Sequence, residues 1–276
     1  AAGAGLAQAP SHALGEARLA NRLFRDASSL AADDADVNVA WGLLLLEKYN
    51  RPEAARSFRT ALEASPEHAA AHLGLARTLA DQNPPAAVES AQQAITINPA
   101  LVEARVFLAE QALDDRRVTE AQRAIEDALA VNPASLPALA LRAAIAATEG
   151  READFESEAR ALLGINPRYG ELYRVAGELM ARQYRFDEAA SLARRALEVE
   201  PGNTRALADL GMYLMRTGDE AAARGFLDRA FRADPFNVAA FNLLALLDTL
   251  DGFETYADSQ MIVRLHPEES PVLRDE

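Results

Sequence analysis

Hydrophobic and polar residues follow the period of an α-helix along most of the chain, and residues 171–201 show this most clearly. Apolar residues there form two stripes, the first of Leu172, Val175, Ala176, Leu179 and Met180, and the second of Phe186, Ala189, Ala190, Leu192, Ala193, Ala196 and Leu197. Spacings of three and four residues put each stripe on one helix face. Pro201 lacks the amide that a helix interior needs, so the second helix is expected to end near Val199.

The same pattern recurs at a fixed interval. Six prolines are separated by 33, 34, 34, 34 and 34 residues, namely Pro66, Pro99, Pro133, Pro167, Pro201 and Pro235. A small residue recurs in phase in each first helix, as Gly42, Ala76, Ala109, Ala143, Gly177, Gly211 and Ala245. Most second helices carry two alanines in phase, such as Ala54 and Ala61. Small side chains let helices approach closely, so a stack of helix pairs is expected.

A 34-residue helix-turn-helix unit with a small crossing residue, two second-helix alanines and a closing proline resembles the tetratricopeptide repeat. Complete units lie at about 35–68, 69–101, 102–135, 136–169, 170–203 and 204–237. The resemblance implies an all-α fold, a right-handed superhelical solenoid of antiparallel helix pairs. We expect a partial N-terminal repeat over residues 1–34, the repeat array over 35–250 and a separate segment over 251–276.

Two units depart from the pattern. In the fourth unit the second-helix alanines are replaced by Phe155 and Leu162, which predicts wider helix spacing or a compensating small neighbour such as Ala159. The second unit is one residue short, and Asn83 in its turn can cap the helix that begins with two prolines. The single tryptophan, Trp41, is expected to fill the core between neighbouring units.

The two ends of the chain differ from the array. Pro10 argues against a helix ahead of Gly15, so the first half-unit is expected to fray there. After residue 250, the segments FETYA and QMIVRLHP flank Asp258-Ser259, which predicts two short strands in a hairpin. Ser270-Pro271 then reads as a helix start. Because the chain starts at Ala1 without a methionine or a secretion signal and stops within this helix, it is expected to be a fragment of a longer protein.

Residues 253–273 are similar to the junction in bacterial repeat proteins that continue into a gluzincin-type zinc peptidase domain. This similarity implies an alternative function, in which the repeats form the non-catalytic part of a larger zinc metallopeptidase and recruit substrate or stabilise the catalytic domain. The bacterial cytoplasm and the periplasm are both compatible with the sequence.

Composition restricts the classes of partner. The formal net charge of -14 disfavours nucleic-acid binding, which depends on Lys and Arg neutralising phosphates. No apolar run approaches the roughly 20 residues that span a bilayer. The chain has no Cys, and its His68 and His72 share helical spacing without forming HExxH, so no metal site, cofactor site or catalytic group is predicted. The chain is not expected to be an enzyme.

The concave face of such an array is lined mainly by first helices. The stripe that faces it becomes rich in arginine in the fifth and sixth units, and the candidate ligand-binding residues are Arg174, Arg182, Arg205, Arg216, Met212 and Glu178. Two interpretations of these arginines stay open. Either they pair with carboxylates such as Glu171 on their own helices, or they bind an acidic peptide segment through bidentate hydrogen bonds.

The sequence therefore predicts a protein-binding scaffold that takes a peptide or protein segment in its concave groove. A third alternative is self-association, in which residues 237–250 pair with another copy because a terminal unit without a polar cap exposes apolar surface.

Overall fold

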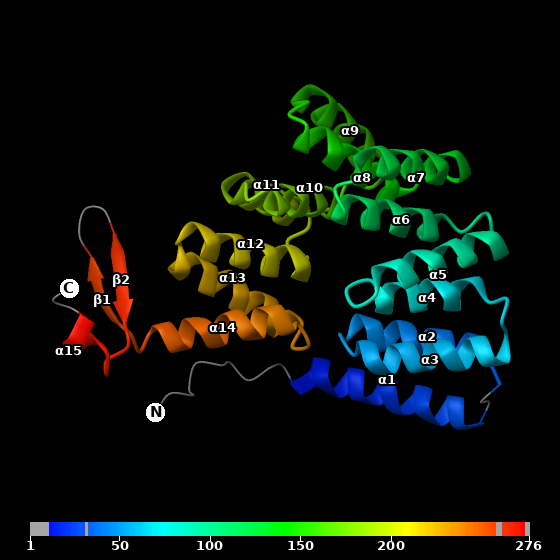
Figure 1. The fold of residues 1–276 in the computed structure, drawn as a ribbon, viewed down its shortest axis with the longest axis horizontal. Coiled ribbons are helices and arrows are strands. Elements are labelled where there is room, and N and C mark those ends of the chain that lie inside the picture. The colour runs from blue at the N-terminus through cyan, green and yellow to red at the C-terminus, as the bar shows by residue number, and fades with distance from the viewer. Residues whose placement is uncertain (1–10, 31–32, 258–260, 274–276) are drawn as a thin grey trace.

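The computed structural model describes residues 11–30, 33–257 and 261–273. Helices alternate between two roles, as the repeat predicts (Figure 1). The first helices are α2 (Ala35–Glu47), α4 (Ala69–Leu79), α6 (Val102–Asp114), α8 (Leu136–Thr148), α10 (Glu171–Arg182), α12 (Thr204–Thr217) and α14 (Val238–Leu250). The second helices are α1 (Ser11–Leu30), α3 (Arg51–Ala64), α5 (Pro84–Ile97), α7 (Val118–Val131), α9 (Glu152–Ile165), α11 (Phe186–Val199) and α13 (Glu220–Ala233). The predicted helical solenoid is confirmed.

Prolines and caps set the helix boundaries. The helices α3, α5, α7, α9, α11 and α13 each end two residues before one of the six periodic prolines. Asn83 caps α5 as predicted, because its side-chain oxygen accepts a hydrogen bond from the amide of Ala86 at 3.3 Å. Asn203 and Asn237 cap α12 and α14 in the same way. The chain therefore specifies its turns locally, unit by unit.

Small residues allow close contact between helices of each pair. A Cβ atom on Gly42 would lie 2.7 Å from the ring of Phe58, and Gly74 in the next unit packs against the same ring. Phe58 is completely buried between these two glycines. The equivalent alanines Ala76 and Ala109 are also fully buried. The buried apolar residues form clusters that each extend across neighbouring units.

The fourth unit bends the array. Phe155 and Leu162 fill the space that alanines leave in the other second helices, and both are almost fully buried. In compensation, α8 is a helix of small residues, and it packs along α10 more extensively than along its own partner α9. Figure 1 shows α9 projecting from the top of the molecule at this point. Besides Ala159, the small residues of α8 therefore accommodate the larger side chains of α9.

At the N-terminal end, α1 begins at Ser11, four residues ahead of the predicted start at Gly15. Pro10 lies outside the described residues, as does the rest of 1–10, and a proline that precedes a helix does not interrupt it. The indole nitrogen of Trp41 donates a hydrogen bond to Asn21 at 2.9 Å, which joins α2 to α1. Trp41 thus packs between neighbouring helices as predicted.

The C-terminal segment forms the predicted hairpin. Strands β1 (Glu254–Ala257) and β2 (Ile262–Leu265) pair antiparallel, with Glu254 opposite Leu265. The turn predicted at Asp258-Ser259 lies outside the described residues. A short helix, α15 (Ser270–Leu273), follows the hairpin, and the Ser270 hydroxyl lies 2.7 Å from that of Tyr256. Arg264 ties the hairpin to α13 through Glu220 at 2.5 Å. None of the helices in the described part combines the length and the apolar character needed to cross a membrane.

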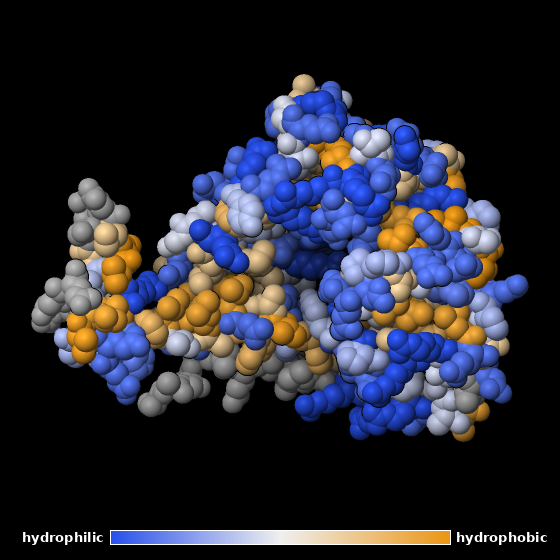
Figure 2. All heavy atoms as spheres, viewed as in Figure 1, coloured by the Kyte–Doolittle hydropathy of each residue, from blue (hydrophilic) through white to orange (hydrophobic). Residues whose placement is uncertain are grey.

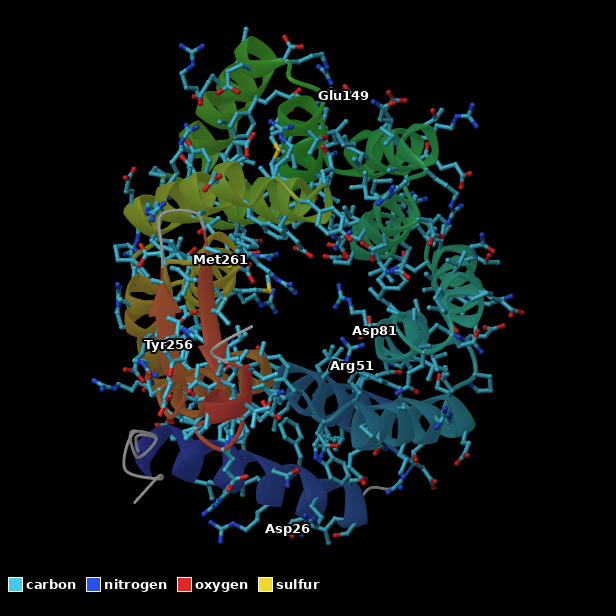
Figure 3. All side chains as sticks on the ribbon, turned by 60° about the vertical axis from the view of Figure 1, so that its left-hand side comes forward. Asp26, Arg51, Asp81, Glu149, Tyr256 and Met261 are labelled. Carbon is cyan, nitrogen blue, oxygen red and sulfur yellow. The ribbon has the colours of Figure 1, made fainter. Side chains whose placement is uncertain are left out.

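The superhelix turns far enough for its first and last units to meet. The Lys48 ammonium, after α2, lies over the ring of Phe236, before α14, at 5.6 Å from the ring centroid. Figure 3, which looks from the side, shows the helices arranged as a ring around a central space. We call this space the lumen and define it by the cavities described next.

Candidate functional site

The lumen consists of three cavities lined mainly by residues of first helices. The largest has a volume of ≈ 850 Å³, and the other two measure ≈ 390 and ≈ 420 Å³. Arg77 on α4, Arg174 on α10 and Arg205 on α12 line all three. Figure 2 shows this hollow near the centre of the molecule. Three arginines from three repeat units therefore face one half-open space.

The walls of the largest cavity combine apolar and polar groups. Val102 and Val106 of α6, Ala140 of α8 and Val175 of α10 provide apolar wall, and Glu110 lines the same cavity. Arg51 and Asp81, labelled in Figure 3, border the lumen on the side of the first units and form an ion pair at 3.0 Å. The walls of the lumen therefore combine apolar side chains with charges of both signs.

Arg174 is held by three carboxylates. Its guanidinium contacts Glu171 at 2.8 Å, Glu178 at 3.0 Å and Asp209 at 3.2 Å, and only 13% of its side chain is exposed. Burial alone would lower the pKa of Arg174, but these three carboxylates raise it. Burial likewise opposes ionisation of Glu171, yet Arg174 and Asn203 hold the pKa of Glu171 below its usual value. Arg174 is thus a structural part of the wall.

Arg182 is also paired. It forms ion pairs with Glu178 on its own helix, at 2.7 Å, and with Asp114 at the end of α6, two units earlier. Burial lowers the pKa of Arg182. Because its side chain is 40% exposed, the pair with Glu178 contributes at most about 1 kcal/mol to stability.

Arg77 and Arg205 differ from these two arginines. Within the described residues, neither guanidinium makes a hydrogen bond or an ion pair with a carboxylate, although both line all three cavities. Arg205 is exposed and Arg77 is half-buried. The backbone carbonyl of Arg77 accepts a hydrogen bond from the side chain of Arg51 at 3.4 Å. The guanidinium of Arg77 takes no part in this contact. These two arginines can donate to an incoming anionic group.

Two lumen carboxylates have raised pKa values. Burial next to Glu178 raises the pKa of Asp209 to about 6, against the lowering effect of Arg174. Glu110 lines the lumen as an exposed residue, and partial desolvation by the surrounding walls raises its pKa, whereas Arg77 opposes the shift. Protonation of either carboxyl would make the lumen more positive.

The six residues selected from the sequence divide into two groups. Arg174, Arg182, Glu178 and Arg205 line the lumen together. Met212 packs against the hydrophobic core, and Arg216 lies over the ring of Phe186 at 6.0 Å from its centroid, and neither lines the three cavities.

The sequence stripe did not single out several lumen residues. Ala208 is the residue of α12 in phase with Arg174 on the inward-facing stripe, and Asp209 lies one residue beyond it, so a wider stripe would include Asp209. Arg51 starts a second helix, where no repeat spacing marks it as inward-facing. Arg77 is in phase with Glu178 but lies outside the arginine-rich fifth and sixth units, and only the structure shows that, among the described residues, its guanidinium has no carboxylate partner.

The histidine pair with helical spacing has structural roles. His68 caps α4 by accepting a hydrogen bond from the amide of Ala71 at 3.2 Å, and its other ring nitrogen lies 3.0 Å from Asp36. His72 contacts the carbonyl of Pro66 at 2.9 Å. In the part of the chain that the structure describes, no group of three His, Cys, Asp or Glu side chains is placed to hold a metal ion.

Two family models described as tetratricopeptide repeat match residues 39–102 and 180–247. Neither match reaches residues 253–273, so the similarity of that segment to zinc peptidase junctions stays a prediction. No curated protein matches the sequence significantly.

Solved structures share the fold at low sequence identity. The Cut9-Hcn1 hetero-tetramer of APC/C is similar with a TM-score of 0.57 and 15% identity over 84% of this chain and 46% of that chain. Yeast Tom70 gives 0.58 and 17%, over 85% and 52%. A tetratricopeptide repeat protein from Parabacteroides merdae gives 0.58 and 16%, over 84% and 92%. The chain spans about half the length of the first two structures.

Proposed function

We propose that this chain, which is built from tetratricopeptide repeats, is a non-enzymatic scaffold that holds an acidic segment of a partner protein in its lumen. Proteins with this fold generally mediate protein–protein interactions and are typically non-enzymatic scaffolds. The binding of a peptide segment, its acidic character and its place in the lumen are the proposed part.

The proposal rests on two lumen arginines whose guanidinium groups form no ion pair with a carboxylate of the described residues. Arg77 and Arg205 line the same cavities from the second and sixth repeat units, and within the described residues neither guanidinium forms an ion pair with a carboxylate. A planar guanidinium binds a carboxylate through two parallel hydrogen bonds. Hydrogen bonds to charged groups contribute about 1.5 to 3 kcal/mol each, so removal of these contacts should weaken binding measurably.

The volume and the walls restrict the ligand further. A cavity of ≈ 850 Å³ accepts a few residues of an extended chain and excludes a folded domain. Val102, Val106 and Val175 add apolar contact beside the arginines. The preferred segment therefore alternates acidic and apolar side chains.

A fluorescence anisotropy titration tests this proposal. The probe is a labelled peptide of about twelve residues that alternates glutamate and valine, and the control replaces each glutamate by lysine. We expect the acidic probe to bind and its affinity to fall as salt is raised, because the contact is electrostatic. Equal binding of both probes, or no binding of the acidic probe, would overturn the proposal.

A further inference from the structure

A further cavity lies where the first helices α6, α8 and α10 end and turn into their second helices. It measures ≈ 560 Å³, and we call it the edge cavity. Leu113, Ile145 and Leu179 form its floor, and each of them is at most 8% exposed. The edge cavity adjoins the lumen at Arg182, which lines both. None of the three arginines common to the lumen cavities lines it, so it is a separate site.

Two turns that border the edge cavity carry large residues in a backbone conformation that suits glycine. Seven positions after the small crossing residue, the fourth and sixth units have Gly150 and Gly218, at φ of 72° and 87°. The third and fifth units have Arg116 and Tyr184 there, at φ of 60° and 61°. This left-handed conformation is unfavourable for a residue with a Cβ atom. The turn itself therefore favours glycine at both positions, and the two side chains need another explanation.

Both of these side chains line the edge cavity, and the glycine of the unit between them leaves it open. Arg116 and Tyr184 belong to the units on either side of Gly150. A Cβ atom on Gly150 would meet no atom within 4 Å. Tyr184 is 79% exposed, and its ring packs edge-on against Phe186 with 6.0 Å between the ring centroids. An arginine and a largely exposed aromatic ring therefore border one apolar floor.

The charge at the edge cavity is opposite in sign to that of the whole chain. The net charge of the chain is -14, yet the described residues that line this cavity include two arginines and no carboxylate. Carboxylates close to it in the sequence are held by other arginines, in the pairs Asp114–Arg182, Asp115–Arg117 and Glu149–Arg151. Within the described residues, the guanidinium of Arg116 and the hydroxyl of Tyr184 form no hydrogen bond or ion pair. Arg116 can therefore donate to an incoming anionic group.

We propose that the edge cavity binds a segment of a partner protein in which an aromatic side chain stands next to a glutamate or aspartate. The aromatic side chain covers the apolar floor and packs against the ring of Tyr184, and the carboxylate accepts hydrogen bonds from Arg116. A cavity of ≈ 560 Å³ accepts one or two large side chains. The contact requires no ligand in the lumen, so it goes beyond the proposed function.

Methyl NMR spectroscopy locates this contact, because the chain has six isoleucines and only Ile145 lines the edge cavity. The protein is labelled at the isoleucine δ1 methyl groups, and Ile145→Val assigns that resonance. The probe is the dipeptide acetyl-Glu-Phe-amide, and the controls are acetyl-Gln-Phe-amide and acetyl-Glu-Ala-amide. The Ile145 resonance should shift saturably with the probe, whereas Ile95 and Ile165 should not respond. Each control dipeptide should bind about fivefold or more weakly, because it lacks the charge or the ring.

Glycine substitutions separate binding from folding. Because glycine suits the φ at both positions, Arg116→Gly and Tyr184→Gly should each unfold at no lower temperature than wild type. Each should nevertheless lose about fivefold or more in affinity for acetyl-Glu-Phe-amide, and Arg116→Gly should also remove the preference for glutamate over glutamine. The control Arg123→Gln changes the net charge as Arg116→Gly does, at an exposed arginine outside the cavity, and should bind as wild type.

Three results would overturn this proposal. They are an Ile145 resonance that does not respond to millimolar acetyl-Glu-Phe-amide, equal binding of the three dipeptides, and glycine variants that bind the probe as wild type does. The result is also separable from the lumen proposal. Arg77→Glu combined with Arg205→Glu should leave the Ile145 titration unchanged, and loss of that titration would place the contact in the lumen instead.

Discussion

Arg182 on α10 forms an ion pair with Asp114 on α6, although a complete repeat unit separates their helices. Helix α8 lies between them and presents the small side chains of Ala140 and Ala144. Larger residues would hold α6 and α10 further apart. The inner wall therefore curves tightly at this point, and this bend allows Phe236 to reach Lys48 and close the ring.

Replacing a small residue of α8 should open the bend. Ala144 is fully buried, so Ala144→Leu overpacks the contact between α8 and α10 and should cost about 1 to 3 kcal/mol. We expect a lower melting temperature and a larger radius of gyration in small-angle scattering. Ala130→Leu, at an exposed position on α7, should change neither quantity. An unchanged radius of gyration in a destabilised Ala144→Leu protein would show that α8 does not control the curvature.

Substitutions at the two residues that meet between the first two units should have coupled effects on the stability of the protein. Gly74→Ala places a methyl group against the ring of Phe58, and should destabilise the protein by about 1 to 3 kcal/mol. Phe58→Leu leaves a cavity and should also destabilise it. The double variant should lose less stability than the sum of the two, because the added methyl group fills part of the cavity. Additive losses in a double-mutant cycle measured by urea unfolding would argue against this contact.

Helix positions could be predicted from the sequence because the prolines, the small crossing residues and the caps act locally. Asn83 is an example, since its capping role depends only on its immediate neighbours. The pairing of Arg174 with Glu171 on its own helix was one of the two interpretations of the sequence, but the pairing of the lumen arginines across units could not be predicted. Arg174 binds Asp209 and Arg182 binds Asp114, and both carboxylates come from other units whose approach depends on superhelical curvature.

Ring closure likewise depends on curvature. A small change in the angle between units accumulates over the array, and no short motif records it. Lys48 and Phe236 therefore gave no sequence signal, although their contact closes the ring. Helix α1 starts at Ser11, earlier than the sequence predicts, because Pro10 precedes the helix and does not interrupt it.

Stability should depend on the protonation of Asp209. Its pKa is raised to about 6 from the ordinary 3.8, so the folded protein binds this proton more tightly than the unfolded chain does. The resulting stabilisation is fully present below about pH 4 and is lost as the pH rises through about 6. Glu171, whose pKa is lowered, acts in the opposite sense and only below its usual value of 4.5.

Comparison with Asp209→Asn isolates this effect. Between about pH 4 and pH 7, wild type should lose up to about 3 kcal/mol relative to the variant, since one pKa unit corresponds to about 1.4 kcal/mol. The measurement is the free energy of unfolding in urea at several pH values. Contributions from Glu110 cancel in the difference between the two proteins. Parallel pH profiles for the two proteins would mean that Asp209 titrates as an exposed carboxyl does.

The most direct test of the lumen as the binding site is a reversal of its charge. Arg77→Glu combined with Arg205→Glu should lower the affinity for the alternating glutamate–valine peptide at least tenfold and create affinity for the lysine–valine peptide. The matched control is Arg123→Glu with Arg194→Glu, which changes net charge equally at exposed arginines of second helices outside the cavities. This control should keep most of the wild-type affinity and preference. If the lumen variant, folded by its thermal melt, still binds the acidic peptide as wild type does, the lumen is not where the partner binds.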